Sequence, residues 1–250
     1  MIITAENYFS PEAQLHYMGA SQFKAFQSCE AAALAEIRGE YVREKTTALL
    51  VGSYVDAHFE GTLDVFQAKH PEIFTRGGDL RSEYRHAENI IARIEQDEMF
   101  MRYMSGQKQV IMTGEIEGVP VKTKVDVYHP GKAIVDLKIM KDFEPVWVDG
   151  KGKLPFVEAW GYDIQGAIYR HVEGNDLPFM LAVATKEKEP DIALLSIPPD
   201  VLDDAMERVI TNITRYADIK AGKIEPVRCE KCDYCKRTKV LTCVVDYRDL

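Results

Sequence analysis

Residues 119–138, VPVKTKVDVYHPGKAIVDLK, contain the clearest fold signal in the chain. Apolar and polar residues alternate from Val119 to His129, which is typical of a β-strand with one buried face. Pro130-Gly131-Lys132 favours a tight turn, and the short apolar run Ala133–Lys138 favours a second strand. The stretch therefore predicts two antiparallel strands joined by a hairpin.

A third strand precedes this hairpin, and helices and further strands surround it. Gln109–Ile116 alternates as a strand, and the turn at Glu117-Gly118 makes the three strands an antiparallel meander. Apolar spacing predicts helices at Ser21 to about Arg38, Thr47 to Gly61, Ser82 to Met104, Phe156–Val172 and Pro199 to about Ala221, and strands at Phe179–Thr185 and Ile192–Ile197. This order predicts a mixed α/β fold, in which helices flank a central sheet made of the meander and the further strands.

The composition indicates one domain with a real core. The chain has 250 residues, of which 46% are hydrophobic and 28% charged. We expect a single domain over residues 1–250, with a helical N-terminal part (about 1–105) and a Cys-rich tail (about 224–250). No apolar run reaches membrane-spanning length and the N-terminus lacks the features of a signal peptide, so a cytoplasmic protein without a membrane partner is expected.

The net charge bears on how the chain could meet nucleic acid. A formal charge of −9 argues against a protein that coats nucleic acid by charge alone. It does not exclude an enzyme that meets phosphates through a divalent metal, because acidic ligands lower the net charge until the metal binds. Such an enzyme still needs a local basic surface.

The two strands of the hairpin carry a group of acidic and basic residues. Asp126 lies on the first strand, and Asp136 and Lys138 share one face of the second. The turn at Pro130-Gly131 brings the carboxylates close together, where they repel unless a cation lies between them. Mg²⁺ or Mn²⁺ suits such oxygen ligands and would activate a water, which Lys138 would orient. The alternative is an exposed strand face with an acidic pair and a lysine.

Two helices carry further polar pairs at helical spacing. Gln165 and Tyr169 are four residues apart and share a face, although an ordinary amphipathic helix has the same pattern. Upstream, Asp56 and Glu60 form a similar pair beside Gly52. His58 lies about 200° around the helix from Asp56, so the two cannot readily serve one metal. A packed or solvated role is the alternative for His58.

Taken in order, these residues resemble the PD-(D/E)XK nuclease superfamily, specifically its RecB-like and phage RecE-type exonuclease branch. The branch is marked by Gly-x-x-x-His-x-x-x-Glu on a helix, an Asp on a strand, an acid-x-Lys strand and a Gln-x-x-x-Tyr helix. The matching residues are Gly52, Asp56, Glu60, Asp126, Asp136-Leu137-Lys138, Gln165 and Tyr169. The segment Tyr17–Glu40 is also similar to phage exonucleases, and the resemblance spans Ser21 to Cys235. Asp56 stands where most of the branch has a histidine.

The resemblance implies a restriction-endonuclease-like sheet and a DNA exonuclease that acts on duplex ends in phage-type recombination. Asp56, Asp126, Asp136 and the Leu137 carbonyl would hold one or two Mg²⁺ or Mn²⁺ ions, and Lys138 would position the attacking water. Gln165 and Tyr169 would bind the substrate or order the site. The expected partners are double-stranded DNA, a single-strand annealing protein and further copies of the chain in a ring.

The cysteines predict a second metal site. Cys229, Cys232 and Cys235 lie within seven residues, and a reducing compartment favours metal ligation over disulfides. The fourth ligand is Cys29 or Cys243. The spacing suits a 4Fe-4S cluster, with Zn²⁺ as the alternative, and some RecB-like relatives pair one N-terminal cysteine with such a trio. Unligated thiols are the remaining interpretation.

Two other functions are compatible with these residues. The first is a CRISPR-type or repair nuclease with the same site and an iron–sulphur cluster. The second belongs to another class, a catalytically silent DNA-binding or assembly module that its cysteine site stabilises. Cleavage of linear DNA in the presence of Mn²⁺ discriminates between a nuclease and the silent module.

Overall fold

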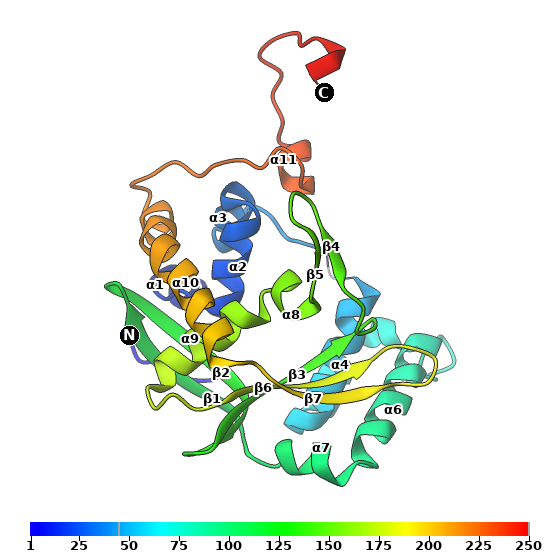
Figure 1. Cartoon of the computed structure of the whole chain (residues 1–250). Coiled ribbons are helices and arrows are strands. Elements are labelled where there is room, and N and C mark those ends of the chain that lie inside the picture. Colours follow the sequence, from blue (N-terminus) through cyan, green and yellow to red (C-terminus); the bar gives the residue numbers. More distant parts are fainter. Residues whose placement is uncertain (45, 250) are drawn as a thin grey trace.

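A five-stranded mixed sheet forms the centre of the molecule (Figure 1). The computed structural model describes residues 1–44 and 46–249. The strands are ordered β1-β2-β3-β6-β7, and only the β3–β6 pair is parallel. Their bounds are β1 (Gln107–Ile116), β2 (Val119–His129), β3 (Ala133–Met140), β6 (Phe179–Thr185) and β7 (Ile192–Ser196). The predicted mixed α/β class and the antiparallel meander β1-β2-β3 are confirmed.

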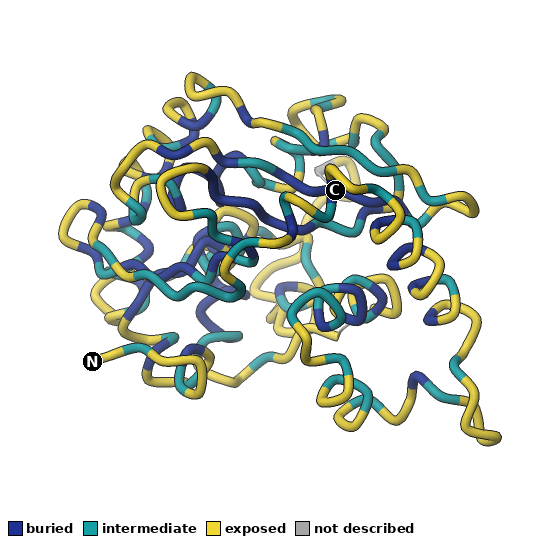
Figure 2. Tube along the Cα trace, turned by 90° about the horizontal axis from the view of Figure 1, so that it is seen from below, coloured by how far each residue is buried: buried dark blue, intermediate teal, exposed yellow. Residues whose placement is uncertain are grey.

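Helices cover both faces of the sheet. One face packs against α2, α9 and α10, and the other against α4, α6 and α7 (Figure 1). The helices are α1 (Pro11–His16), α2 (Ala20–Ser28), α3 (Glu30–Ile37), α4 (Thr47–Glu60), α5 (Leu63–Lys69), α6 (Ser82–Glu95), α7 (Glu98–Tyr103), α8 (Phe156–Ala159), α9 (Tyr162–Glu173), α10 (Pro199–Lys220) and α11 (Asp233–Arg237), with short 3₁₀ turns at Pro71–Ile73 and Tyr247–Asp249. The helices thus enclose the sheet, whose inner strands β2, β3 and β6 are mostly buried, and Figure 2 shows the buried stretches running through the middle of the molecule.

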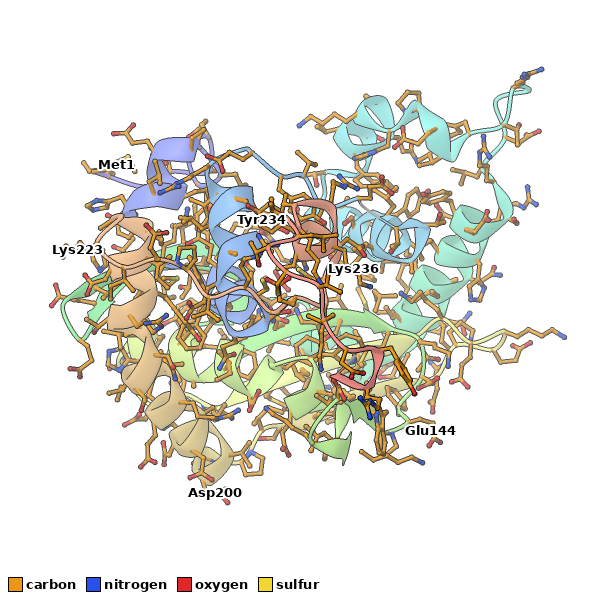
Figure 3. All side chains as sticks on the ribbon, turned by 90° about the horizontal axis from the view of Figure 1, so that it is seen from above. Met1, Glu144, Asp200, Lys223, Tyr234 and Lys236 are labelled. Carbon is orange, nitrogen blue, oxygen red and sulfur yellow. The ribbon has the colours of Figure 1, made fainter. Side chains whose placement is uncertain are left out.

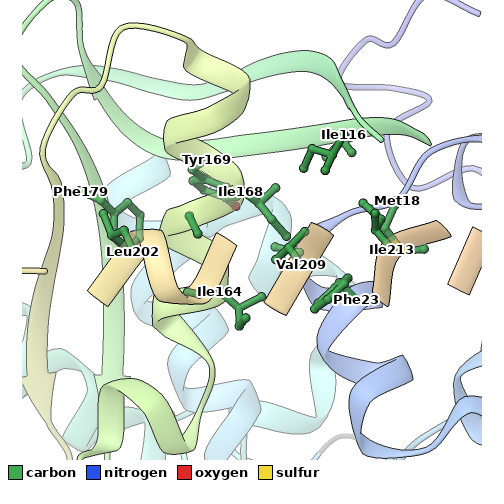
Figure 4. Close-up of a cluster of buried hydrophobic side chains, with 14 of the residues drawn as sticks. Met18, Phe23, Ile116, Ile164, Ile168, Tyr169, Phe179, Leu202, Val209 and Ile213 are labelled. Atoms are coloured by element: carbon green, nitrogen blue, oxygen red, sulfur yellow. The ribbon is translucent and has the colours of Figure 1, made fainter. Parts of the chain in front are cut away.

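The larger of the two cores lies between the sheet and the helix pair α9–α10 (Figure 4). Ile164 and Ile168 of α9 pack with Leu202 and Val209 of α10 over Phe179 of β6, and all five are fully or almost fully buried. Burial of each such side chain stabilises the fold by about 1.5–3 kcal/mol. This packing fixes α9 over the sheet, and α9 carries Gln165 and Tyr169.

Three of the predicted helices are broken in the structure. The Ser21–Arg38 helix breaks at Cys29, whose extended backbone (φ −163°, ψ 110°) separates α2 from α3. The Phe156–Val172 helix breaks at Gly161, which adopts φ 63° between α8 and α9. The Ser82–Met104 helix breaks before Asp97, whose carboxylate accepts a hydrogen bond from Phe100 N and begins α7.

The loop after β3 also differs from expectation. It contains a two-stranded hairpin of β4 (Val146–Val148) and β5 (Gly152–Leu154), which the Gly- and Lys-rich composition of the segment did not indicate. The strands are too short for alternation to be recognised, since only three residues form each one. Val146 and Val148 are half-buried and Trp147 between them is exposed.

None of the helices in the described residues is long and apolar enough to cross a membrane.

We expect Gly166→Ala to destabilise the protein, because a Cβ at this position would lie 2.4 Å from Phe179 Cδ1 and 2.8 Å from Leu202 Cδ2. The gain in helix propensity of about 1 kcal/mol is smaller than the cost of overpacking this interior, so a net loss of about 1–3 kcal/mol is expected. Chemical denaturation measures the free energy of unfolding.

Gly52→Ala is the matched control, because its Cβ would meet no atom within 4 Å and the residue also lies inside a helix. This variant should be as stable as the parent or slightly more stable. Equal effects of the two substitutions would contradict the packing of α9 described above.

Candidate active site

Strands β2 and β3 separate at the candidate carboxylates. Their pairing includes Val127 with Val135 and stops there, although the same register would next oppose Asp126 and Asp136. In place of a backbone pair, Leu137 N donates a hydrogen bond to Asp126 Oδ2 over 3.1 Å. The Asp126 carboxylate therefore takes a position at the sheet that a backbone carbonyl would otherwise occupy, and the strands spread around it.

Asp136 is held by contacts from two elements. Its Oδ1 accepts a hydrogen bond of 2.7 Å from Gln165 Nε2 on α9, and its Oδ2 forms an ion pair with Lys138 Nζ on its own strand. The carboxylate is almost completely buried, and among the described residues Oδ2 has no hydrogen-bond partner beyond this ion pair. One acceptor of the group is thus left for a further ligand.

Helix α4 presents Asp56 to the same site. Asp56 lines one groove together with Lys138 and a second hollow together with Asp126 and Leu137. His58 instead forms a 2.8 Å contact through Nε2 with Glu95 Oε1 on α6. Asp56, and not His58, therefore lies beside the other candidate ligands.

The donor set fits a hard divalent cation. Asp56, Asp126 and Asp136 offer carboxylate oxygens, which Mg²⁺ and Mn²⁺ prefer, and Leu137 lies at the same place. Among the described residues these oxygens do not converge as closely as the cysteine sulfurs of the second site. Carboxylates this close together repel one another, so a cation would both fit the donors and relieve their repulsion.

Charge and burial shift the ionisation of these groups. Burial raises the pKa of Asp56 to about 7; Lys138 opposes this shift and Asp136 adds to it. Burial, followed by the charge of Asp136, raises the pKa of Asp126 well above its ordinary value. Burial alone would lower the pKa of Lys138, but Asp136 and Asp126 outweigh it and raise that pKa. The lysine therefore stays charged, while the site favours protons or another cation on its carboxylates.

The side chains of Gln165 and Tyr169 contact other groups of the protein. Gln165 is occupied by Asp136, and the Tyr169 hydroxyl donates a 3.0 Å hydrogen bond to the Lys124 carbonyl on β2. Both residues are buried, since they lie on the face of α9 that packs against the sheet. Their geometry favours the alternative role, in which they order the site.

Sequence reasoning did not identify Lys24 and Tyr162. Lys24 of α2 and Lys138 lie 5.4 Å and 5.3 Å from the centroid of the Tyr162 ring, so the ring is shared by two cations. Lys24 Nζ donates to the Trp160 carbonyl at 3.4 Å, and burial, together with Lys138, lowers its pKa to about 8. Nothing in the spacing of the sequence links Lys24 to a site more than a hundred residues away.

Gln109 was also missed. It lies opposite Asp126 in the register of β1 and β2, but the pairing omits this position and Gln109 adopts φ 54°. Its Nε2 points to Asp126 Oδ1 at 3.4 Å. A non-glycine residue in this conformation is uncommon and is held there by its surroundings. Both ladders of β2 are therefore interrupted at the level of Asp126.

A groove of about 880 Å³ opens at this site. Asp56 and Lys138 line it, and it extends past Lys141 to Val146 at the base of the β4–β5 hairpin and to Trp160. A linear polymer bound in this groove could therefore contact Lys138 and Asp56 and extend to the base of the hairpin.

The second candidate site is formed by four cysteines from distant parts of the chain. The Sγ atoms of Cys29, Cys229, Cys232 and Cys235 all lie within 4.8 Å of one another. Cys243 is exposed and lies outside the group. The break between α2 and α3 occurs at Cys29, so the residue that ends one helix also contributes to the cluster.

The cysteine cluster joins the tail to the N-terminal helices. Helix α11, with Tyr234 and Lys236, lies beside them in Figure 3, and Ala31 N donates to the Val227 carbonyl at 3.2 Å. Backbone N–H groups of Cys232 and Cys235 donate to the sulfurs of Cys229 and Cys232. Burial alone would raise the pKa of Cys229. The N–H groups of Lys231 and Cys232 outweigh burial and lower this pKa to about 6, which favours the thiolate.

Comparisons with known proteins agree with this architecture. The profile of a family described as "PDDEXK-like domain of unknown function (DUF3799)" matches residues 19–238. A crystal structure from Eubacterium rectale, named "Putative exonuclease", is 48% identical, with a TM-score of 0.95 over 100% of this chain and 98% of that chain. No curated protein sequence matches the chain.

We expect Asp56→Asn to stabilise the metal-free protein at high pH. The pKa of Asp56 is about 7 in the folded chain against an ordinary value of 3.8, so its contribution to stability is present below pH 3.8 and is lost as the pH rises through 7. In EDTA, the variant should match the parent near pH 4 and exceed it by about 4 kcal/mol at pH 8, because a pKa difference of one corresponds to about 1.4 kcal/mol.

The free energy of unfolding, measured at several pH values, checks this expectation. Asp79→Asn serves as the control, because Asp79 is exposed in a loop and its substitution should not change the pH dependence. A parent that is as stable as Asp56→Asn at pH 8 would show that Asp56 does not experience the burial and charge described here.

Proposed function

The chain belongs to the PD-(D/E)XK nuclease superfamily, and on that basis we propose that it is a metal-dependent DNA exonuclease that hydrolyses phosphodiesters from duplex ends. The observation that carries the proposal is the contact of Asp136 with both Lys138 and Gln165, beside Asp126 at the point where β2 leaves β3. Strands β2 and β3 and helix α9 supply this group, and Asp56 of α4 adds a fourth element, so that the residues are spread over more than a hundred positions. An ordinary exposed strand face would not bury Asp136 or surround it in this way.

The residues have distinct roles in the proposed reaction. Asp56, Asp126 and Asp136 would hold Mg²⁺ or Mn²⁺, with the Leu137 carbonyl as a further ligand. When bound, the ion polarises the phosphodiester and lowers the pKa of a water. Lys138 remains charged beside Asp136 and orients the attacking water or stabilises the charge that develops on the phosphate. Gln165 fixes Asp136, and Tyr169 fixes β2 at Lys124, two residues before Asp126.

Exonuclease action is supported by the Eubacterium rectale protein, whose name states that activity and whose chain is matched almost completely. The RecE-type resemblance supports a role in phage-type recombination, with a single-strand annealing protein as partner and a ring of identical chains. A CRISPR-type or repair nuclease would use the same residues. Comparison of linear with closed-circular DNA separates exonuclease from endonuclease activity, because an exonuclease requires an end.

We expect Asp136→Asn and Lys138→Ala each to lower the rate of Mn²⁺-dependent degradation of linear duplex DNA at least about a hundredfold, because the first loses a carboxylate that would hold the metal ion and the second loses the charge beside the attacking water and the phosphate. EDTA should abolish the activity of the parent. Gel or fluorescence assays of a labelled duplex measure the rate.

Lys132→Ala is the matched control, since Lys132 is exposed in the turn between β2 and β3. It should retain the parental rate, and circular dichroism should show all variants folded. Unchanged degradation by Asp136→Asn would refute the site, and no degradation by the parent with Mn²⁺ would favour a catalytically silent DNA-binding module.

The cysteine site is proposed as a structural zinc centre rather than a 4Fe-4S cluster. Zn–S bonds of about 2.3 Å in a tetrahedron place the sulfurs about 3.8 Å apart. The sulfurs of Cys29 and Cys235 are 3.6 Å apart, and those of Cys229 and Cys235 are 3.9 Å apart. A cube of four irons needs a wider arrangement of its thiolates, so these separations support a single ion.

We expect the purified protein to contain about one zinc per chain, by elemental analysis. Cys29→Ser and Cys232→Ser should lose the zinc and lower the free energy of unfolding by at least about 2 kcal/mol, because metal binding contributes to folding. Cys243→Ser should keep the metal. A brown protein that contains iron and absorbs at about 400 nm would show that the site holds a 4Fe-4S cluster and not zinc. A parent protein without metal would show that the four thiols are unligated.

A further inference from the structure

The alternation of strand β2 is broken at Asp126. Val125 packs in the core that contains α9 and α10, whereas Val127 packs in the core that contains α4 and α6. Residues two apart on a regular strand share a face, so these two valines would lie on the same side of an undistorted sheet. Their separation shows that the backbone of β2 rotates at the residue between them, which is Asp126.

The neighbouring strand β1 is irregular at the same level of the sheet. Gln109, opposite Asp126, adopts a left-handed backbone with φ 54°. The other non-glycine residues with positive φ in the described part of the chain are Glu117, Asp176 and Glu230, and all three lie outside helices and strands. Gln109 therefore carries its strain inside a strand, where it persists only because the surroundings require it. Strain of this kind is concentrated at functional positions.

The side chain of Gln109 completes a grip on the Asp126 carboxylate. Gln109 Nε2 points to Oδ1 at 3.4 Å, and Leu137 N donates to Oδ2 over 3.1 Å. The two donors belong to β1 and β3, which flank β2 on either side. With one N–H at each oxygen, the carboxylate is oriented and both oxygens keep a further acceptor position. Hydrogen bonds to a carboxylate ligand are a common means of fixing its direction toward a metal.

The other end of the Gln109 amide has no partner. Its Oε1 is buried, and no group of the described residues donates a hydrogen bond to it. Gln109 lines a hollow of about 10 Å³ together with Asp56, Asp126 and Leu137, and this volume is close to the space that one water requires. A buried amide oxygen normally accepts a hydrogen bond, so this oxygen indicates a small donor beside the candidate metal ligands.

We propose that Gln109 is a positioning residue of the metal site. Its amide N–H orients Asp126 as a ligand of the divalent ion, and its Oε1 accepts a hydrogen bond from a water in the hollow. The strained backbone of Gln109 and the rotation of β2 occur at one level of the sheet, so the strain is coupled to the placement of this carboxylate. The inference rests on the proposed nuclease function and deepens it, because it assigns a residue that serves the same site without contacting the reacting phosphate.

Gln109→Gly separates this role from a structural one. Glycine adopts φ 54° without strain, so the variant should melt at the parental temperature or a few degrees above it. It lacks the amide, so the Kd for Mn²⁺ should rise by roughly ten- to a hundredfold. Titration of the full-length protein with Mn²⁺ in the absence of DNA, followed by electron paramagnetic resonance of the free ion, measures this Kd. A merely structural role would lower affinity only together with stability.

Gln109→Asn is the second variant. Asparagine tolerates the left-handed backbone, but its amide is one methylene shorter and cannot reach Asp126 in the same way. Its Kd for Mn²⁺ should rise as in Gln109→Gly. During degradation of linear duplex DNA, both variants should need more Mn²⁺ than the parent for the half-maximal rate and should approach the parental rate when Mn²⁺ is saturating. This split between metal requirement and maximal rate is expected of a residue that acts through Asp126.

Glu117→Gly is the matched control. Glu117 has φ 49° and is exposed in the turn that joins β1 to β2, so its replacement relieves the same kind of strain on the same pair of strands. Its melting temperature should not fall, and its Kd for Mn²⁺ should equal that of the parent. Asp136→Asn should abolish the Mn²⁺ binding that the titration detects, which assigns that binding to the candidate site.

The inference is overturned if Gln109→Gly and Gln109→Asn bind Mn²⁺ as tightly as the parent, or if Glu117→Gly loses as much affinity as they do. Neither result would affect the nuclease function. Weakened Mn²⁺ binding in both Gln109 variants, with a parent that binds Mn²⁺ but never cleaves DNA, would support the positioning role and refute the nuclease function alone. A parent that binds no Mn²⁺ would overturn both.

Discussion

Strand β2 stops pairing with β3 at Asp126 and its pairing with β1 omits the same position, and the rest of the candidate site depends on this interruption. Gln109 on one side and Asp136 on the other are the residues that regular pairing would oppose to it. Their missing backbone contacts leave room for side chains, and Leu137 N turns to the Asp126 carboxylate instead. Lys138, Gln165 and Asp56 can approach only because the sheet opens here. Regular ladders would have closed this space with backbone hydrogen bonds and kept the carboxylates apart from α4 and α9.

The sequence predicted those parts of the fold that repeat along the chain. Alternation located β2 with the bounds observed, because the strand is long enough to show its two faces, and the apolar run Phe179–Thr185 located β6. It failed for β4 and β5, which are three residues each, and for the breaks at Cys29 and Gly161. These breaks depend on contacts from distant segments, namely the cysteine loop and Lys24. Local helix preference therefore carried no sign of the break at Cys29, and Gly161 was the only local sign of the other.

The candidate site shows the same division. Residue order located the carboxylates and Lys138 on their elements, because motif spacing is a local property. The spacing of Gln165 and Tyr169 left two roles open, binding of the substrate and ordering of the site, because their contacts depend on how α9 packs against the sheet. Lys24 belongs to a helix whose position is set by the packing of Phe23 and Phe26 against Tyr216 of α10. Only the assembled fold brings this lysine to Tyr162, so no spacing along the chain could have revealed it.

The cysteine cluster has a consequence for the order in which the protein can be completed during synthesis. Cys29 and Cys235 are 206 positions apart, and every strand of the central sheet lies between them. Helices α2 and α3 therefore leave the ribosome long before the thiols that tie them down, and the parallel strand β6 likewise follows its partner β3 after a long delay. The carboxylates of the groove are synthesised before Cys229, Cys232 and Cys235, so the cysteine cluster is completed last. The nascent chain passes through a period in which the site exists but the elements around it are not yet held together.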